Sequence, residues 1–215
     1  MKKRVGIVAK KLSHSLSPII HNSWIDNNKI NAEYVCFEVK ENELDLFYNE
    51  FKKDRNFIGF NVTVPYKENL FKMCDNVSKI ASSIGSLNLI YKKDNQIYGD
   101  NTDYIGFEKI YKKLIDEKIK NILLIGAGGA ARSILKFLND QNIENIDIFT
   151  RTMGKKKTLS ESMTLKNFYT ESKLIRNNKY DLIINSSDAG MLNQNLLDKE
   201  IYSLLPSASY AIDIV

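Results

Sequence analysis

Hydrophobic residues in the first half of the chain switch between a period of two, typical of strands, and a period near 3.6, typical of helices. Leu44, Phe47 and Phe51 recur at helical spacing, so their segment should be an amphipathic helix with these residues in the core. Strands that alternate with helices predict a parallel α/β sheet. The segments follow in the order RVGIVAK (4–10), PIIHNSWIDNN (18–28), EYVCFEV (33–39), ENELDLFYNEFKK (41–53) and FIGFNVTV (57–64).

The last of these strands carries a row of polar side chains. Its alternation places Val62 and Val64 on one face, and Pro65 then ends the strand because proline cannot donate to a sheet. The positions on the opposite face are polar and bring an amide, a hydroxyl and an ammonium group into one line, which marks a candidate functional segment. These polar residues are Asn61, Thr63 and Lys67.

Residues 86–101 have the pattern of a β-hairpin. Asp94 and Asn95 lie between two alternating segments and are typical of a tight hairpin turn. A helix is expected from about Asp103 to Glu117, and we place a domain boundary near Asp103, where the polar end of the hairpin meets this helix.

From Lys120 onward the pattern starts again with strands that are apolar on both faces, as in a buried parallel sheet. A less regular stretch with helical character separates the second and third of these strands. The chain ends within what the pattern indicates is a buried strand, so we expect a fragment or a protein whose last segment is missing. The second-half segments are NILLIG (121–126), the helix ARSILKFLND (131–140), NIDIFTR (145–151), YDLIINSS (180–187) and YAIDIV (210–215).

Composition narrows the class of protein. The 215 residues are 43% hydrophobic, enough for a sizeable core, and the formal charge of +5 comes from scattered lysines without an aromatic-interleaved basic stripe. We therefore expect no nucleic-acid partner. Cys36 and Cys74 have no metal-binding or redox spacing, and we expect no metal site. The apolar run at residues 5–9 is too short for a signal peptide, and no stretch is long enough to span a membrane, so a cytoplasmic protein is expected.

A glycine-rich turn follows the first strand of the second half. Gly126, Gly128 and Gly129 would let the backbone turn tightly and approach a pyrophosphate at the N-terminus of the next helix. A tight strand-to-helix turn without a ligand is the alternative. The following strand ends in Thr150, Arg151 and Thr152 where an acidic residue would bind the ribose of NAD, and the planar fork of arginine suits a 2′-phosphate, which predicts NADP.

Two further clusters carry candidate chemistry. Ser17 before Pro18 has the pattern of a helix N-cap, and Ser15 together with Ser17 could instead bind an anionic group. Residues 100–103 could cap a helix through Asn101 or Thr102. Alternatively, Asp103 could face the Lys67 ammonium and form a proton-transfer unit with it.

The motifs SHSLSP, NVTVPYK, GDNTD, GAGGAA, TRT and NSSDAGM, in this order, resemble the signature segments of the shikimate dehydrogenase family. The resemblance spans nearly the whole chain and implies reversible NADPH-dependent reduction of 3-dehydroshikimate to shikimate, a step of chorismate and aromatic amino acid biosynthesis. It implies two α/β domains flanking a cleft. Residues 1–103 would form the substrate-binding catalytic domain, and residues 104–215 a Rossmann-like NADP-binding domain. A homodimer is left open.

The resemblance also assigns roles to individual residues. Lys67 and Asp103 would be the catalytic pair. Substrate contacts would come from Ser15, Ser17, Asn61, Thr63, Asn88 and Asp103, with Asn61 as a supporting residue. Cofactor contacts would come from Gly126, Ala127, Gly128, Gly129, Ala130, Thr150, Arg151 and Thr152, with Ser186, Gly190 and Ile214 near the nicotinamide.

This chain departs from the family pattern in several places. Leu89 removes a hydroxyl next to Asn88, and Thr150 replaces an asparagine beside Arg151. The family continues after AIDIV with a tyrosine, a glycine, a glutamine and C-terminal helices that this sequence lacks, so part of the substrate site is expected to be absent. Two alternatives follow: a quinate/shikimate dehydrogenase that uses NAD, and a truncated, catalytically silent NADP-binding module.

Overall fold

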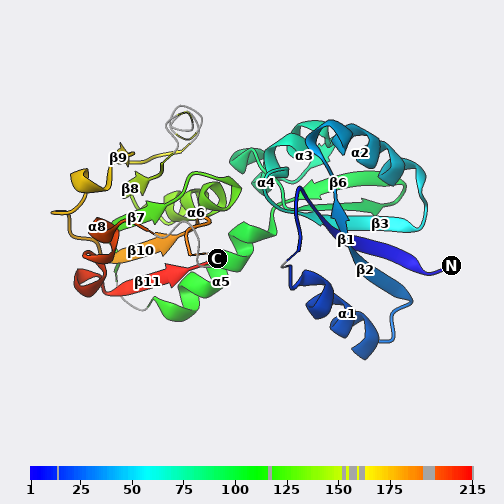
Figure 1. Ribbon diagram of the computed structural model, residues 1–215, viewed down its shortest axis with the longest axis horizontal. Helices are drawn as coiled ribbons and strands as arrows, with labels where there is room; N and C mark the ends of the chain where they lie inside the picture. Colours follow the sequence, from blue (N-terminus) through cyan, green and yellow to red (C-terminus); the bar gives the residue numbers. More distant parts are fainter. Residues whose placement is uncertain are drawn as a thin grey trace. The chain divides into compact units, whose positions relative to one another are not determined.

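The computed structural model describes residues 1–13, 15–115, 118–151, 154, 159, 163–190 and 197–214. The chain divides into two compact units, Met1–Thr102 and Asp103–Val215, each built around its own β-sheet (Figure 1). The α/β class predicted from the sequence is confirmed for both units.

Unit 1 contains a six-stranded mixed sheet in the order β2-β1-β3-β5-β6-β4. β1, β2 and β3 are parallel to one another, whereas β5 runs antiparallel to β3 and to β6. The parallel arrangement expected for the strands that alternate with helices is confirmed for β1, β2 and β3, and the predicted hairpin adds the antiparallel strand β5 beside β3. The elements are β1 (Lys3–Ala9), α1 (Ser17–Asn27), β2 (Ala32–Glu38), η1 (Glu41–Glu43), α2 (Leu44–Lys53), β3 (Phe57–Val62), α3 (Lys67–Met73), β4 (Asn76–Val77), α4 (Lys79–Ile84), β5 (Leu89–Lys93) and β6 (Gln96–Asp100).

The main core of unit 1 lies between the sheet and the helices α2, α3 and α4. The predicted amphipathic helix is confirmed, since Leu44, Phe47 and Phe51 are buried on its inner face. The Phe51 ring packs edge-on against Phe57 and Phe60 of β3, with ring centroids 4.9 Å apart in both pairs. Aromatic edge-to-face pairs add to the burial of apolar area, so α2 is held firmly on β3.

Two turns shape this part of unit 1, one between β5 and β6 and one directly after β3. Asp94 and Asn95 have φ angles of 51° and 60°, which confirms the predicted hairpin turn between β5 and β6. β3 ends at Val62, so the strand is two residues shorter than the predicted segment 57–64, and Val64 beyond it is 72% exposed. The buried residue beyond the strand is Tyr66, whose N–H donates to the Thr63 carbonyl at 3.0 Å and closes a turn.

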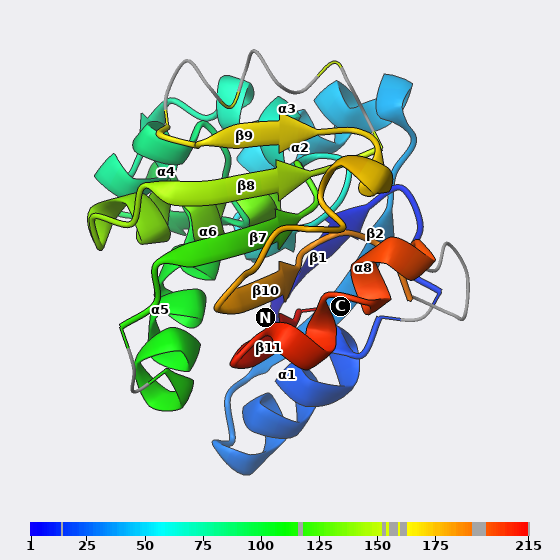
Figure 2. The ribbon, with the colours of Figure 1, turned by 90° about the vertical axis from the view of Figure 1, so that its left-hand side faces the viewer.

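Unit 2 contains a five-stranded sheet in the order β11-β10-β7-β8-β9, in which every pair is parallel (Figure 2). A short strand, β9, forms within the stretch for which helical character was expected. β11 lies at the edge of the described sheet and buries only Ile212, so the expectation of a buried final strand is wrong. The elements are α5 (Thr102–Leu114), β7 (Asn121–Ile125), α6 (Gly129–Asp140), β8 (Asn145–Phe149), β9 (Asn167–Tyr169), η3 (Ser172–Leu174), β10 (Leu182–Asn185), α8 (Lys199–Tyr202), η5 (Leu205–Ser207) and β11 (Tyr210–Asp213).

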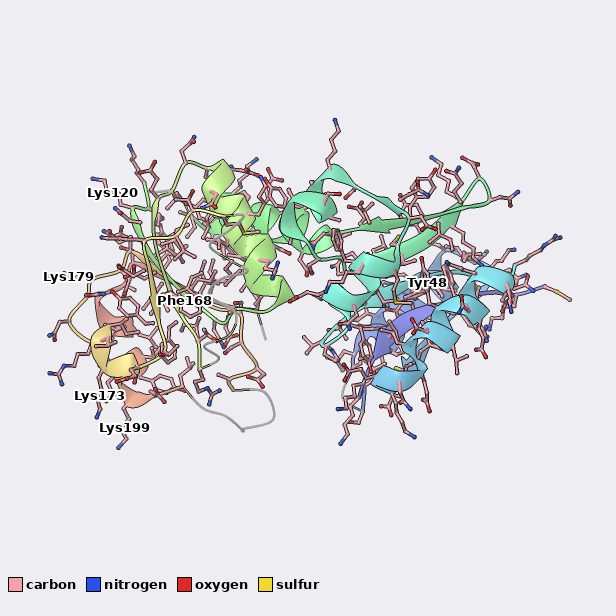
Figure 3. All side chains as sticks on the ribbon, turned by 90° about the horizontal axis from the view of Figure 1, so that it is seen from above. Tyr48, Lys120, Phe168, Lys173, Lys179 and Lys199 are labelled. Carbon is pink, nitrogen blue, oxygen red and sulfur yellow. The ribbon has the colours of Figure 1, made fainter. Side chains whose placement is uncertain are left out.

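Lysines of unit 2 project outward from the sheet. Lys120, Lys173, Lys179 and Lys199 are exposed and point away from the ribbon in Figure 3. Within the described ranges, His, Cys, Asp and Glu side chains do not gather in groups of three or more that could bind a metal ion. None of the helices within the described ranges has the length and apolar character required to cross a bilayer.

Candidate active site

The turn after β7 requires a glycine at its first position. Gly126 has a φ angle of +105°, which side-chain-bearing residues rarely adopt, and its N–H donates to the Phe149 carbonyl at 2.8 Å. A Cβ at Gly126 would lie 2.9 Å from the Ser186 Oγ and 3.0 Å from the Ser187 backbone nitrogen. The segments that follow β7 and β10 therefore approach each other closely at this glycine.

The N-terminus of α6 is open above the same turn. Gly128 is the N-cap, and no side chain caps the helix there. A Cβ at Gly128 would meet no atom of the described residues within 4 Å, other than its chain neighbours and the helix backbone. Uncapped N–H groups at a helix N-terminus bind anions, and this arrangement fits a pyrophosphate. Ala127 packs into the core with 5% exposure and therefore offers only its backbone, while Gly129 and Ala130 form the first turn of α6.

A cavity of about 260 Å³ lies at the carboxyl ends of β7, β8 and β10. Thr150 is 8% exposed, and its N–H donates to the Tyr169 carbonyl of β9 at 3.0 Å. The Arg151 side chain is half-exposed at the cavity. Thr152, which the sequence also placed at the cofactor, lies outside the described residues. The cavity is lined by Ile125, Gly126, Phe149, Thr150, Arg151, Ser187, Asp188 and Leu197.

Asn185 organises the loop that closes this end of the sheet, and sequence reasoning missed it. Its Nδ2 donates to the Ala189 carbonyl at 3.0 Å, and its Oδ1 accepts from the Ser187 hydroxyl at 2.7 Å. Ser186 donates its hydroxyl to the Ile125 carbonyl at 2.7 Å, and Gly190 has a φ angle of +93°. The Ile214 N–H donates to the Asn185 carbonyl. A polar residue at the end of an otherwise apolar strand was the signal available in the sequence.

The serine pair of unit 1 follows β1, and its capping role differs from the expectation. α1 begins at Ser17 and Leu16 occupies the N-cap position, so the expectation that Ser17 is the N-cap is wrong. The Ser15 Oγ instead accepts a hydrogen bond of 3.3 Å from the Ser17 N–H. The Ser15 N–H in turn donates to the Leu12 carbonyl within the loop that joins β1 to α1.

Tyr34 of β2 links the predicted substrate residues and was also missed by sequence reasoning. Its hydroxyl donates to the Asn61 Oδ1 at 2.8 Å and lies within hydrogen-bonding reach of the Ser17 side chain. Burial raises the pKa of Tyr34 well above its usual value, and the hydrogen bond with Ser17 offsets this only in part, so the phenol stays protonated. The His21 imidazole stacks on the Tyr34 ring with centroids 4.2 Å apart.

Thr63 and Lys67 follow β3. The Thr63 N–H donates to the Val8 carbonyl at 3.1 Å, which fixes Thr63 beside the end of β1. Lys67 is the first residue of α3 and is partly buried, and its carbonyl accepts a hydrogen bond from the Leu87 N–H. The turn after β3 and the Leu87 segment thus hold the Lys67 backbone from two sides.

Asn88 binds the first residue of α5. The Asn88 side chain is 9% exposed, its Oδ1 accepts from the Thr102 N–H at 2.8 Å, and its Nδ2 and the Thr102 Oγ1 lie 2.9 Å apart. Asn101 is fully buried and donates its Nδ2 to the Ser86 carbonyl at 3.0 Å. Asp103 follows in the first turn of α5. Since the Asn61 Nδ2 donates to the Asn88 carbonyl at 3.4 Å, the residues Ser17, Tyr34, Asn61, Asn88 and Thr102 form one connected network.

Two family models match consecutive parts of the chain. The shikimate dehydrogenase substrate binding domain matches residues 7–90, and the shikimate/quinate 5-dehydrogenase model matches residues 108–214. Shikimate dehydrogenase (NADP(+)) of Caldicellulosiruptor saccharolyticus is 36% identical over 193 residues, covering 88% of this chain and 69% of the relative. The enzyme of that name from Bacillus anthracis is 36% identical over 197 residues, covering 89% and 71%.

Solved structures agree with the sequence comparison. Shikimate dehydrogenase 1 of Peptoclostridium difficile superposes with a TM-score of 0.86 at 32% identity, covering 99% of this chain and 77% of that one. The shikimate 5-dehydrogenase of Thermus thermophilus, solved in complex with NADP(H) and shikimate, gives a TM-score of 0.79 at 25% identity, with 99% and 78% covered. Unit 2 accordingly has the Rossmann-like fold of these enzymes. The chain belongs to the shikimate dehydrogenase family.

Proposed function

We propose that this protein is an NADP-dependent oxidoreductase that interconverts 3-dehydroshikimate and shikimate. The observation that carries the proposal is that both units match the two halves of one enzyme family, over residues 7–90 and 108–214. The curated relatives named above are shikimate dehydrogenases that use NADP(+). The reaction is a step in the biosynthesis of chorismate and aromatic amino acids, and we assign the protein to the cytoplasm.

We assign substrate binding to residues 1–103 and cofactor binding to residues 104–215. In the first range, the Ser15 and Ser17 hydroxyls bind the substrate carboxylate, because Ser15 lies just before α1, Ser17 is the first residue of that helix, and the Ser15 Oγ already accepts the Ser17 N–H. Thr63 and Asn88, with Asp103, bind the ring hydroxyls. Asn61 supports them from the network that Tyr34 completes.

Lys67 and Asp103 carry the proton transfer in this proposal. The Lys67 ammonium donates a proton to the carbonyl oxygen of 3-dehydroshikimate as that carbonyl is reduced, and in the reverse direction the lysine takes the proton from the hydroxyl. Asp103 accepts a hydrogen bond from the reacting hydroxyl and orients it. General acid–base groups of this kind contribute about a hundredfold to ten-thousandfold to a rate.

The residues at the carboxyl end of the second sheet fit the cofactor. The open α6 N-terminus suits a pyrophosphate, and the Arg151 guanidinium suits a 2′-phosphate. Gly126 to Ala130, Thr150, Arg151 and Thr152 would hold NADP, with Ser186, Gly190 and Ile214 near the nicotinamide. When bound, the nicotinamide supplies the hydride that enters the ring carbon of the substrate.

The proposal is tested by following the absorbance of reduced nicotinamide with this 215-residue chain, shikimate and NADP. Lys67→Ala should lower kcat at least about a hundredfold while NADP binding, measured by calorimetry, stays unchanged. Lys72→Ala is the matched control, because Lys72 is an exposed lysine of the same helix, and it should leave turnover intact. An active wild type in which Lys67→Ala turns over normally would refute the role of Lys67. A wild type that binds NADP without oxidising shikimate would favour the silent-module alternative.

A further inference from the structure

Two opposite charges share the cavity at the carboxyl ends of β7, β8 and β10. The Arg151 Nη2 and the Asp188 Oδ1 are 4.0 Å apart, and the two side chains are 53% and 70% exposed. Among the described residues that line this cavity, Arg151 and Asp188 are the charged ones. The separation exceeds hydrogen-bond length, so the pair is in close electrostatic contact but is not locked by a direct hydrogen bond.

The two side chains favour different ligands. A guanidinium presents a planar set of donors that matches phosphate oxygens. A carboxylate repels a phosphate but accepts hydrogen bonds from ribose hydroxyls, which is how dinucleotide-binding sheets select a cofactor without a 2′-phosphate. Arg151 extends from the end of β8, where that recognition takes place, and Asp188 reaches the same cavity from the loop after β10.

We propose that Asp188 is a specificity-determining residue that weakens the preference of this site for a 2′-phosphorylated nucleotide, so that NAD competes with NADP more effectively than Arg151 alone would allow. The inference rests on the proposed function, because it takes this cavity as the site of the adenosine ribose. Sequence reasoning had placed Thr150, Arg151 and Thr152 at this end of the sheet and had not considered Asp188.

Two features limit how strongly Asp188 can change the affinity for a 2′-phosphorylated nucleotide. Both side chains are largely solvated, so water and salt screen the repulsion between Asp188 and a phosphate. Exposed charge pairs are worth at most about 1 kcal/mol, which corresponds to about fivefold in a dissociation constant. The effect should shrink as the ionic strength rises.

The test measures binding by calorimetry and needs no turnover. Adenosine 2′,5′-bisphosphate and adenosine 5′-monophosphate are titrated into the wild type and into Asp188→Asn at low salt. Asp188→Asn should bind the bisphosphate up to about fivefold more tightly, while its affinity for the monophosphate stays the same or falls. Glu144→Gln is the matched control, since Glu144 is exposed just before β8, at the opposite end of the strand from Arg151, and its loss changes the net charge equally.

Several outcomes would overturn the inference. Equal changes for the two nucleotides in Asp188→Asn, or no change for either, would show that Asp188 does not discriminate between them. The same gain in Glu144→Gln would show a general charge effect. Failure of the proposed function is separate, because it would appear as loss of shikimate oxidation by the wild type, whatever the ratio of nucleotide affinities in the variants.

Discussion

The Tyr34 hydroxyl donates a 2.8 Å hydrogen bond to the Asn61 Oδ1, although their strands are not neighbours. β1 lies between β2 and β3, so the phenol reaches across one whole strand. On its other side, the Asn61 side-chain amide faces the Asn88 carbonyl, which can only accept a hydrogen bond. The Asn61 Nδ2 therefore points to that carbonyl, and its Oδ1 points to Tyr34. Tyr34 therefore fixes the orientation of Asn61 beside the proposed substrate residues.

Tyr34→Phe should weaken shikimate binding without affecting the cofactor. The substitution keeps the ring that stacks on His21 and removes only the hydroxyl that bonds with Asn61 and Ser17. We expect the KM for shikimate to rise about fivefold to tenfold, the cost of about one hydrogen bond, while the KM for NADP stays constant. Steady-state kinetics with each substrate varied in turn would measure both constants.

Tyr98→Phe is the control for this experiment. The Tyr98 hydroxyl donates to the Gln96 Oε1 at an exposed position of the β5–β6 hairpin, and its loss should leave both KM values unchanged. If Tyr34→Phe raised both KM values equally, the residue would have a general structural role and would not position Asn61.

Asn88 should stabilise the start of α5. Its Oδ1 accepts the Thr102 N–H, as an N-cap side chain does, although it lies fourteen residues away in the sequence. Asn88→Ala should lower the free energy of unfolding by about 1–2 kcal/mol, because it removes the acceptor of the Thr102 N–H at the start of α5. Asn88→Asp keeps an acceptor for the Thr102 N–H and should lose less. Urea denaturation of both variants would measure the difference, and equal losses would contradict a capping role.

Sequence patterns predicted what depends on local periodicity, and they failed where distant residues meet. The spacing of Leu44, Phe47 and Phe51 was enough to define α2, because burial of one helix face decides that element. Nothing local to EYVCFEV distinguishes Tyr34 from the other large residues of β2, since its role depends on the register of three strands. Asp188 likewise acquires its relation to Arg151 only through the order of β8, β7 and β10 in the sheet.

The serine loop illustrates a smaller failure. Ser17 and Pro18 suggested a helix starting after Ser17, but the helix starts one residue earlier and Ser15 binds its first N–H. Helix ends are commonly uncertain by one or two residues, because several side chains compete for the same N–H groups.

Buried tyrosines should make the protein less stable in alkaline solution. Burial raises the pKa of Tyr34 and Tyr180, and the hydroxyl of Tyr180 donates to the Asp147 carboxylate at 2.8 Å. A group whose pKa is higher in the folded state contributes stability that is complete below its unfolded pKa of about 10 and is lost as the pH rises through the folded pKa. Urea denaturation at about pH 8 and about pH 10.5 should show lower stability at the higher pH, and Tyr180→Phe should reduce that difference. An unchanged difference would mean that Tyr180 does not titrate with unfolding.

Two glycines of the same turn should respond differently to alanine. Gly126 has a φ angle of +105°, and a Cβ there would lie 2.9 Å from the Ser186 Oγ, so Gly126→Ala should lower the free energy of unfolding by about 1–3 kcal/mol and weaken NADP binding as well. Gly128 has a φ angle of −87°, and a Cβ there would meet no described atom within 4 Å, so Gly128→Ala should cost at most about 1 kcal/mol, the loss expected for alanine at an N-cap. Its methyl group would instead enter the space in front of α6 where a pyrophosphate fits, so NADP binding should weaken at least about tenfold.

Thermal unfolding of the free protein and calorimetric titration with NADP would separate the two effects. If Gly128→Ala bound NADP as tightly as the wild type, the pyrophosphate could not lie against this turn.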